Sequence, residues 1–88
     1  MKIIRIGAIW CPGCLVMKKI WSKILNDYPS LEVVEFDYDM DNEEVLKYNP
    51  GKVLPVVIFL SENGNEIERI IGEMSENTLR EKISDYVK

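Results

Sequence analysis

The feature that most restricts the fold is a β-type run followed at once by an amphipathic helix pattern and then by a second β-type run. Residues 3–9 are almost continuously apolar and rich in isoleucine, as expected of a central strand covered on both faces. From residue 12 to about residue 28, apolar side chains recur every three to four positions, and Pro29 follows. Residues 31–38 form the second β-type run. This order predicts two parallel strands joined by a right-handed crossover.

The second half of the chain predicts a short helix and a β-hairpin. Asp41 and Glu44 have the spacing of a capping box at the start of a helix. Residues 53–60 predict a third strand. The Asn-Gly pair at 63–64 favours a tight turn, so that a fourth strand at 67–71 runs antiparallel to the third.

A last helix is expected after Gly72, with Ser75 as its N-cap. Its apolar stripe consists of Leu79, Ile83, Tyr86 and Val87. The predicted order is therefore βαβαββα. We expect residues 1–88 to form one α/β domain, in which a four-stranded mixed sheet carries helices on both faces.

The composition argues against several classes of protein. The 88 residues carry a net charge of −4, which gives no basic surface for nucleic acid or an anionic membrane. No apolar stretch approaches the roughly 20 residues that span a bilayer. Lys2 and Arg5 interrupt the N-terminal apolar run too early for a signal peptide. The chain is therefore expected to be cytoplasmic, where a disulfide is usually transient and catalytic.

The segment Trp10-Cys11-Pro12-Gly13-Cys14 contains both cysteines of the chain and lies between the first strand and the first helix. A cysteine at a helix N-cap faces free N–H groups and the positive end of the helix dipole, which favour thiolate over thiol. Pro12 suits the first helical position. We interpret Cys11 as the nucleophile of a redox-active dithiol, with Cys14 less exposed and one helical turn further on.

Two other interpretations of the cysteine pair remain open. Tetrahedral zinc needs four ligands, and this chain offers two cysteines and no histidine. A zinc or iron–sulfur site would therefore need a second chain or a cofactor thiol. The pair could also be two buried small apolar residues, although the Pro-Gly between them is not typical of a helix core.

Three features together resemble the thioredoxin family. They are Trp10-Cys11-Pro12-Gly13-Cys14 at a strand-to-helix junction, Leu54-Pro55 at the start of the third strand, and Asn63-Gly64 followed by Ile71-Gly72-Glu73-Met74-Ser75 before the last helix. The resemblance covers residues 3–88, although a full thioredoxin carries an additional N-terminal strand and helix. It implies a thioredoxin-like fold and a protein-disulfide reductase.

The resemblance also implies how the site is built. The Leu54–Pro55 peptide bond should be cis and lie against Cys11, where its backbone can pair with an extended substrate segment. A shallow groove would be formed by Trp10, Pro12, Gly13, Leu54, Pro55, Gly72 and Met74. The expected partners are disulfide-containing proteins and an electron donor, either a reductase or glutathione. No bound cofactor or metal is expected besides the Cys11–Cys14 disulfide, and the protein should be monomeric. A scaffold of this fold without turnover is the further alternative.

Arg5 does not match the resemblance. Thioredoxins usually keep a buried aspartate at this place, and often a lysine on the neighbouring strand, whose place falls near Glu35 here. One hypothesis is a charge-reversed pair whose cation lowers thiolate pKa values. The other is that the Arg5 stem covers apolar surface while its charged head lies in water.

Overall fold

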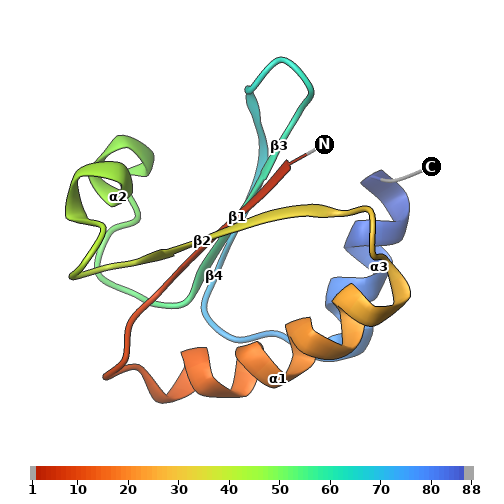
Figure 1. Cartoon of the computed structure of the whole chain (residues 1–88), viewed down its shortest axis with the longest axis horizontal. Coiled ribbons are helices and arrows are strands. Elements are labelled where there is room, and N and C mark those ends of the chain that lie inside the picture. The colour runs from red at the N-terminus through yellow and green to blue at the C-terminus, as the bar shows by residue number, and fades with distance from the viewer. Residues whose placement is uncertain (1, 87–88) are drawn as a thin grey trace.

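The computed structural model describes residues 2–86, which form one mixed four-stranded sheet and three helices (Figure 1). The sheet order is β2-β1-β3-β4, with β1 parallel to β2 and antiparallel to β3, and with β3 antiparallel to β4. The elements in chain order are β1 (Lys2–Gly7), α1 (Pro12–Asp27), β2 (Glu32–Asp37), α2 (Asn42–Tyr48), β3 (Val56–Leu60), β4 (Glu66–Ile71) and α3 (Glu76–Tyr86). The predicted βαβαββα order is confirmed.

The helices cover both faces of the sheet, as expected. Helices α1 and α3 lie on one side and α2 on the other (Figure 1). Successive side chains of a strand point to opposite faces, so β1 and β3 contribute to two separate cores. One core contains Met17 and Trp21 of α1 and Leu79 and Ile83 of α3. The other contains Val45 of α2.

Three strands are shorter than the sequence predicted, because apolar composition does not mark where pairing ends. Strand β2 covers Glu32–Asp37 instead of residues 31–38. Strand β1 ends at Gly7 instead of residue 9, and Ile9 is 84% exposed beyond it. Strand β3 begins at Val56 instead of residue 53. The Leu54–Pro55 bond is cis, and Pro55 has no N–H group to donate to a ladder.

The helix starts differ in how well they were predicted. Ser75 does cap α3, since its Oγ accepts a hydrogen bond from Thr78 N–H at 3.1 Å. The capping box at Asp41 was wrong: its carboxylate makes no cap hydrogen bond and instead accepts the N–H of Asp37 at 2.8 Å. Of the predicted α3 stripe, Leu79 and Ile83 are buried, Tyr86 packs against Phe59, and Val87 lies outside the described residues.

Within residues 2–86, none of the helices combines the length and the apolar character needed to cross a membrane.

Candidate active site

The cysteine pair lies where β1 leads into α1. Cys11 is the N-cap of α1 with extended backbone angles, and Pro12 is the first helical residue, both as predicted. The N–H of Cys14 donates a hydrogen bond to the Cys11 sulfur at 3.2 Å. The N–H of Cys11 donates to Ala8 C=O at 3.2 Å, which fixes the turn between strand and helix. The Cys11 sulfur therefore lies at the positive end of the helix dipole.

The relative exposure of the two cysteines is the reverse of the prediction. Cys11 is only 5% exposed, whereas Cys14 is half-buried. A position at the end of a helix therefore does not by itself leave the Cys11 side chain open to solvent. The pKa of the Cys14 thiol is raised to about 11, first by burial and then by its hydrogen bond with Cys11, while a backbone hydrogen bond with Ala8 acts in the opposite direction.

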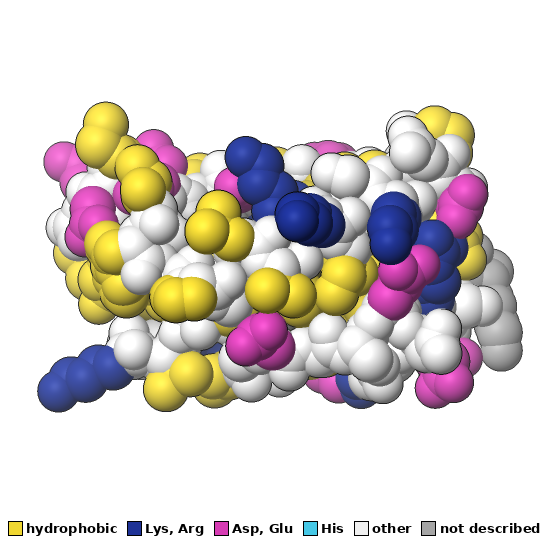
Figure 2. Space-filling model, turned by 90° about the horizontal axis from the view of Figure 1, so that it is seen from below, with side chains coloured by type: hydrophobic (Ala, Val, Ile, Leu, Met, Phe, Trp, Pro, Cys, Tyr) yellow, Lys and Arg dark blue, Asp and Glu magenta, His cyan; other side chains and the backbone are white. Residues whose placement is uncertain are grey.

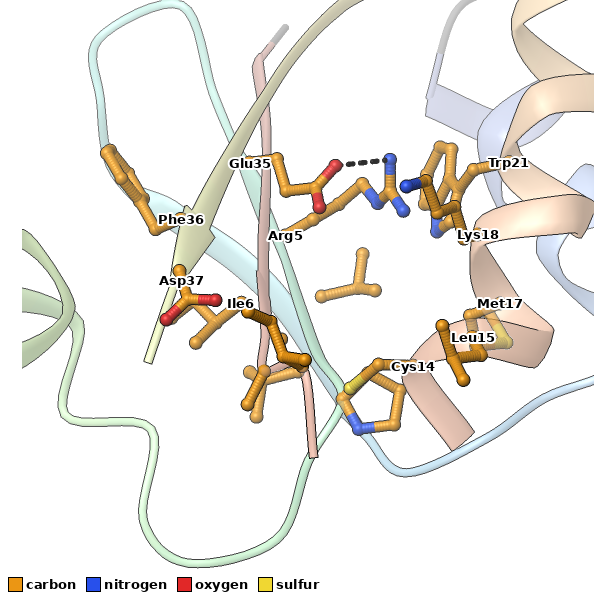
Figure 3. Close-up of a pocket in the computed structure, with 16 residues that line it drawn as sticks. Arg5, Ile6, Cys14, Leu15, Met17, Lys18, Trp21, Glu35, Phe36 and Asp37 are labelled. Atoms are coloured by element: carbon orange, nitrogen blue, oxygen red, sulfur yellow. Dashed lines mark ion pairs between the residues drawn. The ribbon is translucent and has the colours of Figure 1, made fainter. Parts of the chain in front are cut away.

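A pocket of about 190 Å³ lies behind the dithiol, between α1 and strands β1 and β2 (Figure 3). Cys14 lines this pocket together with Arg5, Glu35 and Trp21. The indole Nε1 of Trp21 is the buried side-chain nitrogen or oxygen that lacks a hydrogen-bond partner within residues 2–86. The pocket wall thus contains a thiol, an ion pair and the side chain of Trp21.

Arg5 and Glu35 form an ion pair across β1 and β2. They are direct partners in the parallel register, and Arg5 Nη1 lies 3.4 Å from Glu35 Oε2. The guanidinium also stacks over Trp21, with Cζ 5.1 Å from the ring centroid. The Arg5 side chain is 14% exposed and that of Glu35 is 59% exposed. The hypothesis that the Arg5 head lies in water is therefore wrong, because the head lies over Trp21.

The electrostatics of Arg5 follow from this position. Burial lowers its pKa below the ordinary value, while attraction to Glu35 and to a Cys14 thiolate raises it. Since an arginine stays protonated throughout the range in which proteins are folded, the pocket that Cys14 lines holds a permanent cation.

Pro55 also lines the pocket, and its C=O accepts the N–H of Gly72 at 2.8 Å. This bond joins the segment before β3 to the turn before α3. Leu54 packs against the core on the α2 side, whereas Met74 packs against the core on the opposite face. These two side chains therefore belong partly to the cores, and their place in a substrate groove stays a prediction.

Exposed apolar side chains surround the cysteines. Trp10 is 58% exposed, its Nε1 donates to Asp39 Oδ2 at 2.7 Å, and its ring meets Tyr38 edge to face. Trp10 is thus both anchored and accessible. Ile9, Leu15 and Val16 are also exposed. Figure 2 shows hydrophobic side chains gathered over the N-terminal end of α1.

Two contacts at the site were missed from the sequence. A Cβ built at Gly7 would lie 3.2 Å from Cys14 Sγ, so the glycine leaves room for the sulfur. A Cβ built at Gly13 would lie 3.0 Å from Cγ of Glu73. The contact at Gly7 could have been predicted from the sequence, because a glycine inside a strand often marks the close approach of another group. The contact between Glu73 and Gly13 could not have been predicted, since it depends on how two segments far apart in the sequence are placed.

Within residues 2–86, no group of three or more histidine, cysteine, aspartate or glutamate side chains is arranged to hold a metal ion. A metal bound by Cys11 and Cys14 would therefore need ligands from outside this part of the chain.

Comparisons with known proteins agree on one family. A family model described as Thioredoxin matches residues 1–85. A thioredoxin from Ophiophagus hannah is 26% identical over 85 residues, which are 97% of this chain and 78% of that protein. Among solved structures, the thioredoxin of Fasciola hepatica has a TM-score of 0.83 and 26% identity, with 96% of this chain and 78% of that chain covered. The thioredoxin of Trypanosoma brucei brucei has a TM-score of 0.84 and 26% identity, with 98% and 74% covered.

Proposed function

Because this chain belongs to the thioredoxin family, whose members are thiol–disulfide oxidoreductases, we propose that it reduces disulfide bonds in proteins with Cys11 and Cys14. Members of the family use a redox-active cysteine pair and no external cofactor. The observation that carries the proposal is the Cys11 sulfur at the N-cap of α1, 3.2 Å from the N–H of Cys14.

In the first step, the Cys11 thiolate attacks one sulfur of a substrate disulfide. A bond forms between the Cys11 sulfur and that sulfur, the substrate S–S bond breaks, and the other substrate sulfur leaves as a thiolate. The helix N-terminus and the Cys14 N–H favour the negative charge on Cys11 before the attack.

In the second step, Cys14 loses its proton and attacks the Cys11 sulfur. The Cys11–Cys14 disulfide forms, and the remaining substrate sulfur leaves as a thiolate that takes up a proton. Two electrons pass from the dithiol to the substrate. A reductase or glutathione then supplies two electrons that restore both thiols.

The substrate would bind over the apolar surface next to the dithiol. Ile9, Trp10 and Leu15 offer exposed contact area on one side of Cys11. The backbone around Leu54, together with Pro55, Gly72 and Met74, would form the other side and pair with an extended segment of the substrate. A protein substrate suits this site because the surface is broad and apolar. Action as a monomer in the cytoplasm is part of the same proposal.

The test is reduction of insulin disulfides, followed as turbidity, with thioredoxin reductase and glutathione compared as electron donors. The parent protein should accelerate precipitation well above the donor alone. Cys11→Ser should abolish the activity, and Cys14→Ser should trap a mixed disulfide with the substrate.

Other outcomes would favour the alternatives. A purified protein that contains zinc or an iron–sulfur cluster, and that dimerises only with it, would support a metal-binding module. A protein that shows no activity with either donor, and whose Cys11 resists alkylation at neutral pH, would be a scaffold without turnover.

A further inference from the structure

Cys14 meets a charged environment that the reaction steps above do not use. It lines the pocket of Figure 3 together with Arg5 and Glu35, whose ion pair is drawn as a dashed line in another part of the same pocket wall. Arg5 is held there by Glu35 on β2 and by the ring of Trp21 on α1. Because two elements fix the guanidinium, its charge acts on the sulfur from a defined position.

The charged groups that face Cys14 come from all the elements packed around it. Arg5 comes from β1, Glu35 and Asp37 from β2, and Lys18 from α1, all lining the pocket. Cys11 faces Cys14 from the N-cap of α1. Arg5 is the less exposed of the two cations in this set, because its side chain is 14% exposed whereas Lys18 is classed as exposed. Buried charges act more strongly because solvent screens them less.

We propose that Arg5 is a positioning residue that stabilises the thiolate of Cys14 during the second step, and that Glu35 limits how much of the Arg5 charge acts on that sulfur. This inference rests on the proposed reaction through Cys11 and Cys14. The Cys14 thiol must lose a proton before its sulfur can attack Cys11. The thiolate attracts Arg5 and is repelled by Glu35.

The two partners should therefore have opposite effects. Removing the Arg5 charge leaves Glu35 alone near the sulfur, which disfavours the thiolate. Removing the Glu35 charge leaves Arg5 unpaired, which favours the thiolate. A role of the ion pair in stability alone predicts no such difference in sign.

The test uses the chromogenic disulfide dithionitrobenzoate as substrate. Cys11 attacks the reagent and releases one thionitrobenzoate anion, leaving a mixed disulfide. Cys14 then attacks Cys11 and releases the second anion, so the rate of the second phase reports the Cys14 step. Following this rate against pH gives the apparent pKa of that step.

We expect Arg5→Met to slow the second phase about three- to ten-fold at neutral pH and to shift its pH profile upward. Arg5→Lys should recover much of the rate. Glu35→Gln should accelerate the second phase and shift the profile downward. Glu35 is 59% exposed, so this variant keeps the test valid even if Arg5→Met fails to fold.

The chain offers a matched control pair on the same two strands. Lys2 and Glu32 are also register partners, with Lys2 Nζ 3.7 Å from Glu32 Oε2, and they lie at the far end of β1 on the opposite face. Lys2→Met and Glu32→Gln should leave the second phase unchanged. Overlapping pH profiles for Arg5→Met, Glu35→Gln and these controls would overturn the inference. A parent protein that releases only one anion would instead overturn the proposed function.

Discussion

The backbone of Gly7 lies against the sulfur of Cys14, because a Cβ added to Gly7 would be 3.2 Å from Cys14 Sγ. Strand β1 thereby fixes how far the second cysteine can sink toward the sheet. The position of the Cys14 sulfur is thus limited by Gly7, the last residue of β1. Strand β1 is itself held in place, because it pairs with β2 on one side and with β3 on the other.

Gly7→Ala should impair the second step of the reaction more than the first. The added methyl group forces Cys14 to move by a few tenths of an ångström, and overpacking of this kind costs about 1–3 kcal/mol. Unfolding by urea should show this loss. The two phases with dithionitrobenzoate should show a slower second phase and a nearly unchanged first phase. Equal slowing of both phases would contradict a specific effect on Cys14.

Gly13→Ala should be tolerated by the fold. Its Cβ would meet the exposed, flexible side chain of Glu73, which can move away. Alanine is favoured over glycine in a helix by up to about 1 kcal/mol. The urea midpoint should therefore stay the same or rise. A marked fall would mean that Glu73 cannot move from its place beside the dithiol.

Iodoacetamide should label Cys11 before Cys14 at neutral pH. The pKa of Cys14 is raised to about 11 by burial, so about one Cys14 in ten thousand is a thiolate at that pH. The Cys11 sulfur instead accepts an N–H hydrogen bond at a helix N-terminus. Mass spectrometry of digested peptides gives the order. If labelling followed exposure, Cys14 would react first, and the prediction would fail.

The reduced protein should lose stability as the pH rises from 9.0 toward about 11. Burial raises the pKa of Cys14 above its ordinary value, so the unfolded chain releases this proton at a lower pH than the folded chain does. The contribution to stability is thus present below pH 9.0 and is lost through the folded-state pKa. Urea unfolding under reducing conditions tests this, with Cys14→Ala as the control. The parent should lose stability more steeply than Cys14→Ala, and parallel curves would contradict the prediction.

Asp39→Ala should weaken substrate binding through Trp10. The substitution removes the acceptor of the 2.7 Å hydrogen bond from the indole Nε1 and frees the exposed ring to move. We expect a higher KM for insulin, and a stability change of no more than about 1.5 kcal/mol. Asp39→Asn keeps an acceptor and should stay closer to the parent. An unchanged KM in Asp39→Ala would show that the ring needs no anchor.

The order of elements could be predicted because each segment has a clear apolar period. The nearly continuous apolar run of β1 and the three-to-four spacing in α1 predicted a central strand and an amphipathic helix, and Met17 and Trp21 of that helix are buried. The N-cap position of Cys11 followed from the local sequence alone, because caps depend on neighbouring residues.

The errors have two physical causes. Asp41 has the right spacing for a cap, but its carboxylate accepts the N–H of Asp37, a competing donor four residues earlier. The burial of Cys11 and the packing of Arg5 over Trp21 depend on how α1 lies on the sheet. Local patterns carry no information on that packing.

The alternation of β1 has a consequence for protein engineering. Arg5 and Gly7 are two residues apart on one strand, so both lie on the face that carries α1. Arg5 supplies charge to the pocket that Cys14 lines, and Gly7 supplies space for the Cys14 sulfur. Under the proposed mechanism, the rate of the second step should therefore respond to two substitutions inside the protein, while Ile9, Trp10 and Leu15, which would contact the substrate, stay unchanged.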